Sequence, residues 1–585
     1  MKKFTQGGQV TLHQYNMFGQ VLRRIFFLAL PLYCLFVAAF MYKHIYSGEW
    51  YMFAKYHYAS FMHDVSSNYE EKISFIKPNG EQVFLTIRQI LHGPSFLAVN
   101  EKVFNALIQG LLYGLFISIG FCALLVMYFQ YKSKSFKKSK NYRGMEIAPF
   151  KKVSSQIFKD NRKKGGTDYS IAGLPYPKYS ETFHTMISGG TGSGKTVIIS
   201  DLVQQIKQRG DRAIIYDKMG NYLSHFYEPN TDILLNPLDQ RHQQWGLFSE
   251  VKRESDFSLL AESLIPEEKM HSDPFWLKAS RILLAEVANK LWVHNDLKIE
   301  SLYSKLIVDD FKQLAEFVKG TPAHSIFDEN SPKTASSIRA VLSSYLSSLK
   351  YLEHNEEEQE FSIHDWVSNK ESGFLFLTSR EDQHSSLKPL ISTWINLAIS
   401  ELLSQPQTRE KKLWFILDEL PTLHYIPSLK SGLAQSRQFG GAFILGLQAI
   451  SDLRSIYGHD IAQTLSSLCE TRVSLRTPDP ETAEWASKSL GQREYEEVKE
   501  SISYGANSLR DGNAMNTQKY ISELVLPSEI MSLPSLNGYL RPAEAYPITK
   551  FQVKYKHRET LSERYIEKEQ KQEDIKSSEK IKIKV

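Results

Sequence analysis

Residues 189–196 read Gly189-Gly190-Thr191-Gly192-Ser193-Gly194-Lys195-Thr196 and directly follow the apolar run 183–187. The glycines let the backbone turn tightly, so that successive N–H groups and the N-terminus of the next helix point at phosphate oxygens. The Lys195 ammonium can neutralise the β- and γ-phosphates, and the Thr196 hydroxyl can take a ligand position on Mg²⁺. The sequence therefore predicts a phosphate-binding loop between a strand and a helix, with ATP and Mg²⁺ as its ligands.

The chain downstream of this loop alternates between short apolar runs and helical patterns. The apolar runs are candidate buried strands, and they lie at 213–216, 233–235, 373–377, 413–417, 442–447 and 471–475. Such alternation is typical of a mostly parallel sheet with helices on both faces. The predicted fold class is therefore α/β, with residues 151–244 and 361–556 forming one nucleotide-binding domain.

Residues 245–360 interrupt this pattern. Their apolar residues recur with helical spacing, for example over 257–264, 276–293 and 335–352. We expect them to form a compact all-α domain inserted into the nucleotide-binding domain, as a lid or a platform for a partner. A chain of 585 residues has room for such a domain, because folding units average about 150 residues.

A second nucleotide motif closes the run 413–417, where Asp418 and Glu419 follow the predicted strand. A carboxylate at this position can hold Mg²⁺ through its water shell, which is the role expected of Asp418. An adjacent glutamate can orient and polarise water for attack on the γ-phosphate, so Glu419 indicates hydrolysis. The alternative is that the two acidic residues only cap the end of a strand.

Polar residues near the ends of the next predicted strands are further candidates. Gln448 ends the run 442–447, where its amide could contact the γ-phosphate and sense hydrolysis. Arg437 precedes that run and could stabilise transition-state charge in the site of a neighbouring subunit. From sequence alone, either residue could equally be a solvated polar side chain. Arg472 and Arg476 alternate on one predicted strand and are weaker candidates of the same kind.

Two long apolar runs, 25–42 and 106–129, carry no charged residue and are long enough to cross a membrane. No small-residue cleavage pattern follows the first run, so we interpret it as a retained anchor rather than a signal peptide. Basic residues precede the first run and follow the second, whereas the loop 43–102 has balanced charges. The positive-inside rule then places both termini inside and the loop outside. Residues 1–150 are thus expected to form a multi-pass membrane domain.

The segment 132–164 is strongly basic, because Lys and Arg far outnumber acidic residues there. This charge suits topology determination and attraction to anionic lipid headgroups, and it also suits contact with a nucleic-acid backbone. Gly110 and Gly114 form a G-x-x-x-G pair that permits close helix packing, either within the hairpin or between subunits. The three cysteines and seventeen histidines show no ligand spacing, so no structural zinc site is expected.

With both nucleotide motifs in place, the chain closely resembles the conjugative coupling proteins of type IV secretion, the TraD and TrwB group. The resemblance covers most of the chain. It rests on further short motifs that occur in order, namely Ile215-Tyr216-Asp217, Leu235-Asn236-Pro237-Leu238-Asp239, Asp273-Pro274-Phe275-Trp276, Ser436-Arg437-Gln438-Phe439-Gly440-Gly441, Gly446-Leu447-Gln448, Ser503-Tyr504-Gly505 and Arg510-Asp511-Gly512. Each motif is weak alone, but their combination in this order is highly specific.

The resemblance implies a RecA-like motor domain in a hexameric ring, with the motor and both termini on the cytoplasmic side of the bacterial inner membrane. It further implies that ATP hydrolysis moves single-stranded DNA, with its attached relaxase, towards a secretion channel. The implied partners are therefore DNA, relaxase and other relaxosome proteins, channel components, membrane lipids and further copies of the chain. The resemblance also implies roles for the site residues. Lys195 and Thr196 would contact nucleotide and metal, and Asp418 and Glu419 would form the acidic pair. Gln448 would sense the γ-phosphate, and Arg437 would act as an arginine finger across the subunit interface.

Residues 557–585 depart from the family pattern, because similar proteins often continue into a longer tail that engages the DNA-processing complex. These residues mix Lys and Glu, and we expect them to form a solvated helix or a disordered end. Two alternative functions stay open. One is a motor or nucleotide-dependent receptor for protein effectors of a type IV secretion system. The other is a chromosome-segregation motor, although such motors usually carry more membrane spans and a DNA-reading winged helix.

Overall fold

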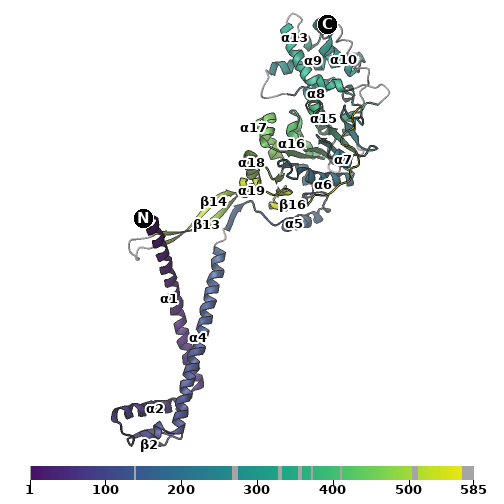
Figure 1. The fold of residues 1–585 in the computed structure, drawn as a ribbon. Helices are drawn as coiled ribbons and strands as arrows, with labels where there is room; N and C mark the ends of the chain where they lie inside the picture. Colours follow the sequence, from purple (N-terminus) through teal and green to yellow (C-terminus); the bar gives the residue numbers. More distant parts are fainter. Residues whose placement is uncertain are drawn as a thin grey trace. The chain divides into compact units, whose positions relative to one another are not determined.

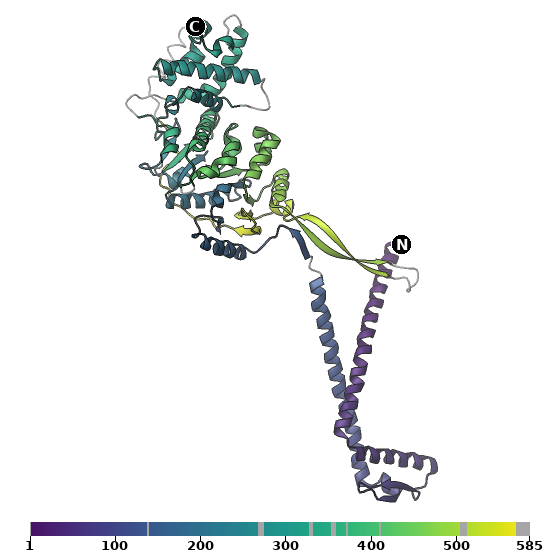
Figure 2. The same cartoon turned by 180° about the vertical axis from the view of Figure 1, so that it is seen from behind.

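The computed structural model describes residues 2–136, 140–266, 274–326, 332–352, 359–369, 373–408, 411–503 and 512–568. The chain separates into two units, Met1–Lys140 with Glu497–Gln518, and Asn141–Glu496 with Lys519–Val585. Each unit is described by itself below, and Figures 1 and 2 show their elements from two sides.

The first unit is built on two long helices, α1 (Lys2–His44) and α4 (Pro94–Phe136), which pack against each other (Figure 1). By length and composition, the segments Phe18–His44 and Pro94–Lys132 are able to cross a membrane, and both extend beyond the predicted runs. Many of their large apolar side chains are exposed, as expected of helices that face lipid. The sequence analysis therefore found the two helices but not their full lengths.

The G-x-x-x-G pair packs the two helices together within the hairpin. A Cβ atom at Gly110 would lie 3.1 Å from the ring of Phe40, and one at Gly114 would lie 3.1 Å from the ring of Tyr33 and 3.2 Å from Val37. The absence of side chains at these two positions therefore allows the close approach of α4 to α1. Of the two arrangements left open by the sequence, the structure shows the one inside the hairpin.

A small domain connects the two long helices. Helices α2 (Ser47–Ser66) and α3 (Ile87–Leu91) pack with the antiparallel strands β1 (Lys72–Ile76) and β2 (Gln82–Thr86). Alternate residues of β1 point inwards, as its burial pattern shows. The buried core of this domain consists of Ala59, Ile73, Phe75, Ile87, Ile90 and Phe96.

The second unit contains a nine-stranded sheet. Its strands lie in the order β16 (Thr549–Gln552), β15 (Asn537–Arg541), β12 (Thr471–Leu475), β6 (Thr185–Ser188), β11 (Gly441–Leu447), β10 (Leu413–Leu417), β7 (Arg212–Asp217), β9 (Phe374–Thr378) and β8 (Ile233–Leu235). The strands from β12 to β8 run parallel, and β15 and β16 add antiparallel strands at one edge. The predicted α/β class with a mostly parallel sheet is confirmed.

Both faces of this sheet are covered, which explains why its strands are continuous apolar runs rather than alternating ones. Along β10, Trp414 and Ile416 join one hydrophobic cluster with helix α6 (Lys195–Gln208). Phe415 and Leu417 point to the other face and join a cluster with helix α15 (His384–Ser404). Successive side chains of a strand point to opposite faces, so one apolar run supplies two layers of core.

Residues 245–360 are mainly helical, as predicted. The helices are α8 (Ser255–Leu264), α9 (Pro274–Val293), α10 (Ile299–Tyr303), α11 (Phe311–Phe317), α12 (Pro322–Ile326) and α13 (Pro332–Leu346), and α14 (Ile363–Ser368) follows them. Their buried residues belong to the same cluster as α15 and one face of the sheet. The helical region therefore shares a continuous core with the motor rather than closing a core of its own.

Helix α5 (Phe150–Lys163) lies in the basic segment after the hairpin. It buries Val153, Ile157 and Asn161 and leaves its lysines exposed. Strands β3 (Lys140–Gly144), β13 (Gln492–Ser503) and β14 (Gly512–Glu523) form a three-stranded sheet in the order β14-β13-β3. The family motifs at 503–512 fall mostly outside the described residues.

Candidate active site

The phosphate loop joins strand β6 to helix α6, as the sequence predicts. The N–H of Gly189 donates to the carbonyl of Leu447 at the end of β11 (3.1 Å). The N–H of Gly190 donates to the carbonyl of Arg476, just past β12 (2.9 Å). The two strands that flank β6 therefore hold the start of the loop, at the carboxyl edge of the sheet where ligands bind in open α/β folds.

Two glycines are required by the geometry of the loop. Gly194 has φ +116°, a left-handed conformation that residues with a side chain rarely adopt, and a Cβ atom there would lie 3.0 Å from Leu536. Gly189 has no room for a side chain, because a Cβ atom would lie 2.6 Å from the Ser193 hydroxyl and 2.7 Å from Leu475. The sequence motif thus follows from steric constraints visible in the structure.

Four side chains predicted separately from the sequence form one hydrogen-bonded chain at this edge. The Lys195 ammonium lies 3.1 Å from a carboxylate oxygen of Glu419. The Gln448 amide donates to the same oxygen at 2.7 Å. The Thr191 hydroxyl in turn donates to the Gln448 carbonyl oxygen at 3.0 Å. The structure therefore brings the lysine and threonine of the loop, the glutamate after β10 and the glutamine after β11 to one place.

Asp418 lies beside this chain and is half-buried. The Tyr222 hydroxyl donates to one of its carboxylate oxygens at 2.8 Å, and the same hydroxyl interacts with that of Thr196. The other oxygen, Oδ1, is buried and has no hydrogen-bond partner among the described residues. Burial raises the pKa of Asp418, while the charge of Lys195 and the Tyr222 hydrogen bond oppose that rise.

The Asp418 carboxylate, with its orphaned buried oxygen, and the Thr196 hydroxyl both contact the Tyr222 hydroxyl, and together they fit a hard divalent cation. A buried acceptor without a partner is costly, and Mg²⁺ prefers oxygen ligands and usually keeps several waters. The Asp418 carboxylate and the Thr196 hydroxyl therefore provide a donor set of the right chemistry. Both residues were predicted as metal contacts.

The loop that carries Tyr222 is organised by Asp217, the last residue of β7. Its carboxylate accepts hydrogen bonds from the backbone N–H groups of Asn221 (2.9 Å), Tyr222 (2.6 Å) and Leu223 (2.9 Å). These bonds satisfy backbone N–H groups at the start of the short helix α7 (Leu223–Phe226). Burial raises the pKa of Asp217 to about 6, and the three N–H donors oppose that rise. Asp217 thereby fixes the tyrosine that contacts Asp418.

Sequence reasoning missed Tyr222 as part of the site. The tyrosine lies 196 residues from Asp418 in the chain, and neither residue carries a local signal of the contact. An indirect signal was present, because Asp217 ends a buried strand next to the loop and a short helix follows it. That pattern predicts a capped turn at the carboxyl edge of the sheet, although not which side chain the turn presents.

Arg437 is not part of this cluster. It lies in the 3-10 helix η6 (Ser436–Phe439), which follows helix α16 (Leu429–Gln435) and precedes β11. Strands β6 and β11 are parallel, so a residue before β11 and a loop after β6 lie at opposite edges of the sheet. Its guanidinium is exposed and lies 4.0 Å from the centre of the Phe183 ring. The structure therefore separates Arg437 from the phosphate loop of its own chain.

The two weaker arginine candidates differ in their surroundings. Arg472 is buried in β12, and its guanidinium donates to the hydroxyl and the carbonyl of Ser466. Arg476 follows β12, and its carbonyl accepts the hydrogen bond from Gly190 described above. Arg472 therefore has a packing role in this chain.

The C-terminal segment 553–568 lies on the motor domain. Arg558 and Lys556 form ion pairs with Asp201 on helix α6. The N–H of Leu561 donates to the carbonyl of Ser224 at 2.8 Å. Residues 557–568 are exposed or half-buried, as expected of a solvated end, but they form no helix, and backbone hydrogen bonds and the Arg558 ion pair hold them on the motor. Residues 569–585 lie outside the described residues.

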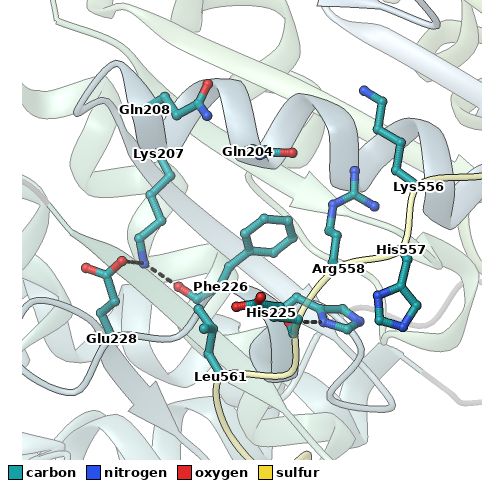
Figure 3. Close-up of a pocket in the computed structure, with 11 residues that line it drawn as sticks. Gln204, Lys207, Gln208, His225, Phe226, Glu228, Lys556, His557, Arg558 and Leu561 are labelled. Carbon is teal, nitrogen blue, oxygen red and sulfur yellow. Dashed lines mark hydrogen bonds and ion pairs between the residues drawn. The ribbon is translucent and has the colours of Figure 1, made fainter.

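A cavity of about 600 Å³ lies between this segment and helix α6. Figure 3 shows residues of α6 and α7 facing the residues of the C-terminal segment around it. The His225 ring interacts with the carbonyl of Glu559 (2.9 Å), and Lys207 forms an ion pair with Glu228 (3.2 Å) (Figure 3). The C-terminal segment is therefore packed beside the helix that begins at the phosphate loop.

This chain matches a protein-family model and is similar to two known proteins. Residues 168–554 match the model of the type IV secretion-system coupling protein DNA-binding domain. The chain is 32% identical to the coupling protein TraD of Escherichia coli (strain K12) over 97% of this chain and 79% of that protein. It is also 24% identical to the protein VirD4 of Rhizobium radiobacter, over 43% of this chain and 37% of that protein.

Solved structures of the bacterial conjugative coupling protein TrwB, lacking its first 70 residues, are also similar. The unbound form is 31% identical, covers 74% of this chain and 97% of its own, and has a TM-score of 0.66. A structure of TrwB in complex with ADP and Mg²⁺ matches equally well, with a TM-score of 0.66 and 98% of its own chain covered. From the family model, the identity to TraD and the likeness to TrwB, this chain belongs to the type IV secretion coupling proteins of the TraD and TrwB family.

Proposed function

We propose that this chain is a membrane-anchored ATPase that moves single-stranded DNA, with its attached relaxase, to a type IV secretion channel during conjugation. The observation that carries the hydrolytic part is the cluster in which Lys195, Glu419, Gln448 and Thr191 are hydrogen-bonded beside Asp418, whose Oδ1 is buried. The DNA part is supported by membership of the family and by the match to its DNA-binding domain.

The proposed roles of the site residues follow from their charges and their positions around the phosphate loop. The loop N–H groups and the Lys195 ammonium bind the phosphates of ATP. Thr196 and Asp418 would hold Mg²⁺, which when bound neutralises charge on the phosphate oxygens. Glu419 orients the attacking water and accepts its proton, and the Gln448 amide contacts the γ-phosphate.

The ion pair between Lys195 and Glu419 should break when nucleotide binds. Phosphate oxygens compete with the Glu419 carboxylate for the same ammonium, and the two cannot both be its nearest anion. Phosphate binding therefore leaves the carboxylate free to act on water. This exchange couples the activation of Glu419 to the arrival of substrate.

Arg437 is proposed to act in the site of a neighbouring subunit. Its position at the amino edge of the sheet keeps it from its own phosphate loop, whereas a ring of subunits would place one chain's amino edge near the next chain's carboxyl edge. An arginine supplied across an interface stabilises the charge of the transferring phosphoryl group. We accordingly propose a closed ring, a hexamer as in the family resemblance.

The decisive test is ATP turnover by the full chain purified in detergent, with and without single-stranded DNA. Lys195→Ala and Glu419→Gln are expected to abolish DNA-stimulated turnover and donor transfer, since they remove the phosphate contact and the general base. Glu419→Gln should still bind ATP, which separates lost chemistry from lost folding. Normal transfer by either variant would overturn the proposal.

The same assay separates the DNA motor from its main alternative. A motor or receptor for protein effectors would show turnover, or nucleotide binding, that no single-stranded DNA stimulates. Strong stimulation by DNA is expected here. A nucleotide-binding platform without hydrolysis is disfavoured by Glu419, because binding alone does not need a base next to Asp418.

Membrane topology is proposed from the flanking basic residues, with both termini and the motor in the cytoplasm. The test is labelling of single cysteines in cells with a membrane-impermeant maleimide. Tyr58→Cys, exposed in the small domain, should react from outside, whereas Phe158→Cys, exposed on α5, should react only after the membrane is opened. The opposite pattern would reverse the proposed orientation.

A further inference from the structure

The Phe183 ring restricts the orientation of the exposed Arg437 side chain. Its guanidinium carbon lies 4.0 Å from the centre of the Phe183 ring, a stacked cation–π distance. Within the described ranges, no carboxylate forms an ion pair with this guanidinium, although Glu181 and Asp211 line the same cavity of about 710 Å³. Its N–H donors are therefore left for a partner outside the chain, while its plane is fixed from one side.

Phe183 is itself firmly placed. It is the last residue of the 3-10 helix η1 (Ser180–Phe183), and one residue separates it from the strand β6 that leads to the phosphate loop. Its carbonyl accepts a hydrogen bond from the N–H of Glu470 at 2.9 Å. The ring is half-buried, so one part packs on the protein and the other supports Arg437.

The next residue, His184, ties the segment that carries Arg437 to the same strand. Its Nε2 interacts with the carbonyl of Leu433 on α16 (2.8 Å), and its Nδ1 accepts from the N–H of Phe443 on β11 (3.2 Å). Leu433 and Phe443 lie on either side of Arg437 in the chain. Burial lowers the pKa of His184 to about 4, so the imidazole is neutral and can serve as one donor and one acceptor.

We propose that Phe183 is a positioning residue for Arg437: its ring holds the guanidinium so that the N–H donors face the neighbouring subunit. The proposal rests on the trans role of Arg437 given under the proposed function. Without the ring, the Arg437 side chain would sample many rotamers. Ordering it in the transition state would then cost conformational entropy in every turnover. The phosphate loop and the arginine of one chain are thus anchored to the two ends of a single short strand.

The test compares Phe183→Leu with Phe183→Tyr in the full chain in detergent, with ATP and single-stranded DNA. Leucine keeps an apolar side chain but no π face, so kcat should fall roughly fivefold to tenfold while KM for ATP stays within about twofold. Tyrosine keeps the ring and should restore kcat to within about twofold of the wild type. Wild-type kcat in Phe183→Leu would overturn the proposal.

A double variant separates positioning from packing. If Phe183 acts only through Arg437, Phe183→Leu in an Arg437→Ala background should lower kcat no further, because the group it positions is absent. A further fall of similar size in that background would mean that the ring acts through packing, and it would overturn the proposal.

The trans role of Arg437 and the positioning role of Phe183 can be overturned separately. If Arg437→Ala retains wild-type turnover, the proposed trans role is wrong and the positioning role falls with it. If Arg437→Ala is inactive while Phe183→Leu is fully active, only the positioning role is wrong. Rings mixed from Phe183→Leu and Lys195→Ala subunits give a third readout. The Lys195→Ala subunits supply a correctly positioned Arg437, and the Phe183→Leu subunits supply an intact nucleotide site. Turnover in the mixture should therefore exceed that of Phe183→Leu subunits at the same concentration of intact sites.

Discussion

The two edges of the central sheet are organised in opposite ways. At the carboxyl edge, Lys195 and Gln448 both bond Glu419, and one buried oxygen of Asp418 has no partner within the described ranges. At the amino edge, Glu181 and Lys412 form a buried pair, whereas the exposed Arg437 contacts the Phe183 ring and forms no ion pair with any residue that the structure describes. One edge thus holds a set of groups that converge on a substrate, and the other presents a charge outwards. This difference supports the proposal that a neighbouring chain completes the site.

The largest expected effect is that of Arg437→Ala. If this arginine serves the neighbouring site, its loss should lower kcat by about a thousandfold, while ATP binding measured with a fluorescent nucleotide stays unchanged. Lys430→Ala, an exposed lysine on the preceding helix, is the control and should leave kcat unaltered. A fall of less than threefold in Arg437→Ala would remove the functional contrast between the two edges.

Removing a paired charge at the amino edge should instead affect stability. Lys412 is buried with Glu181, and burial lowers the pKa of Lys412 to about 8. Lys412→Met leaves the glutamate buried without its partner, which should lower the free energy of unfolding by about 3 kcal/mol. The kcat of the protein that remains folded should stay near the wild-type value. Denaturant unfolding followed by tryptophan fluorescence measures the free energy of unfolding. A large loss of kcat in the folded Lys412→Met protein would contradict the division of roles between the two edges.

The buried His184 makes the amino edge sensitive to acid. Its folded-state pKa of about 4 lies below the ordinary 6.5, so the unfolded chain binds more protons between these values and stability falls as pH falls. From pH 7 to pH 5 this residue should account for a loss of about 2 kcal/mol. In His184→Gln the same unfolding measurement should show a shallower dependence on pH. An unchanged slope would mean that His184 titrates normally.

The smallest effect is expected from Tyr222→Phe at the carboxyl edge. Loss of the hydroxyl removes the hydrogen bond to Asp418, so the Mg²⁺ concentration for half-maximal turnover should rise about tenfold. Tyr227→Phe, a buried tyrosine just past the same short helix, is the matched control. Equal Mg²⁺ dependence in the two variants would show that Tyr222 does not orient the metal-binding carboxylate.

Local motifs explain how much of the site the sequence predicts. The loop 189–196 and the pair Asp418 and Glu419 are contiguous, and their chemistry follows from residue types at fixed spacing. The apolar runs also predict the strands well, because strands covered on both faces need no polar alternation. The parallel order of the sheet then brings Gln448 to the loop.

Contacts between distant segments were not predictable in this way. Tyr222 meets Asp418 only because β7 and β10 are neighbours in the sheet. The charge of the C-terminal segment predicts a solvated end, and it does not predict that Arg558 forms an ion pair with Asp201 on α6. Likewise, the helical pattern of residues 245–360 predicts an all-α region, but it does not reveal which face of the sheet the buried residues of that region join.

The most direct test of the shared site is turnover in rings mixed from two inactive variants. Arg437→Ala keeps an intact nucleotide site, and Glu419→Gln keeps an intact arginine. When equal amounts assemble at random, roughly a quarter of the interfaces should combine an intact site with an intact arginine, and turnover should rise towards that fraction of the wild type. Turnover that stays at the level of the two separate variants would contradict a site completed by the neighbouring chain.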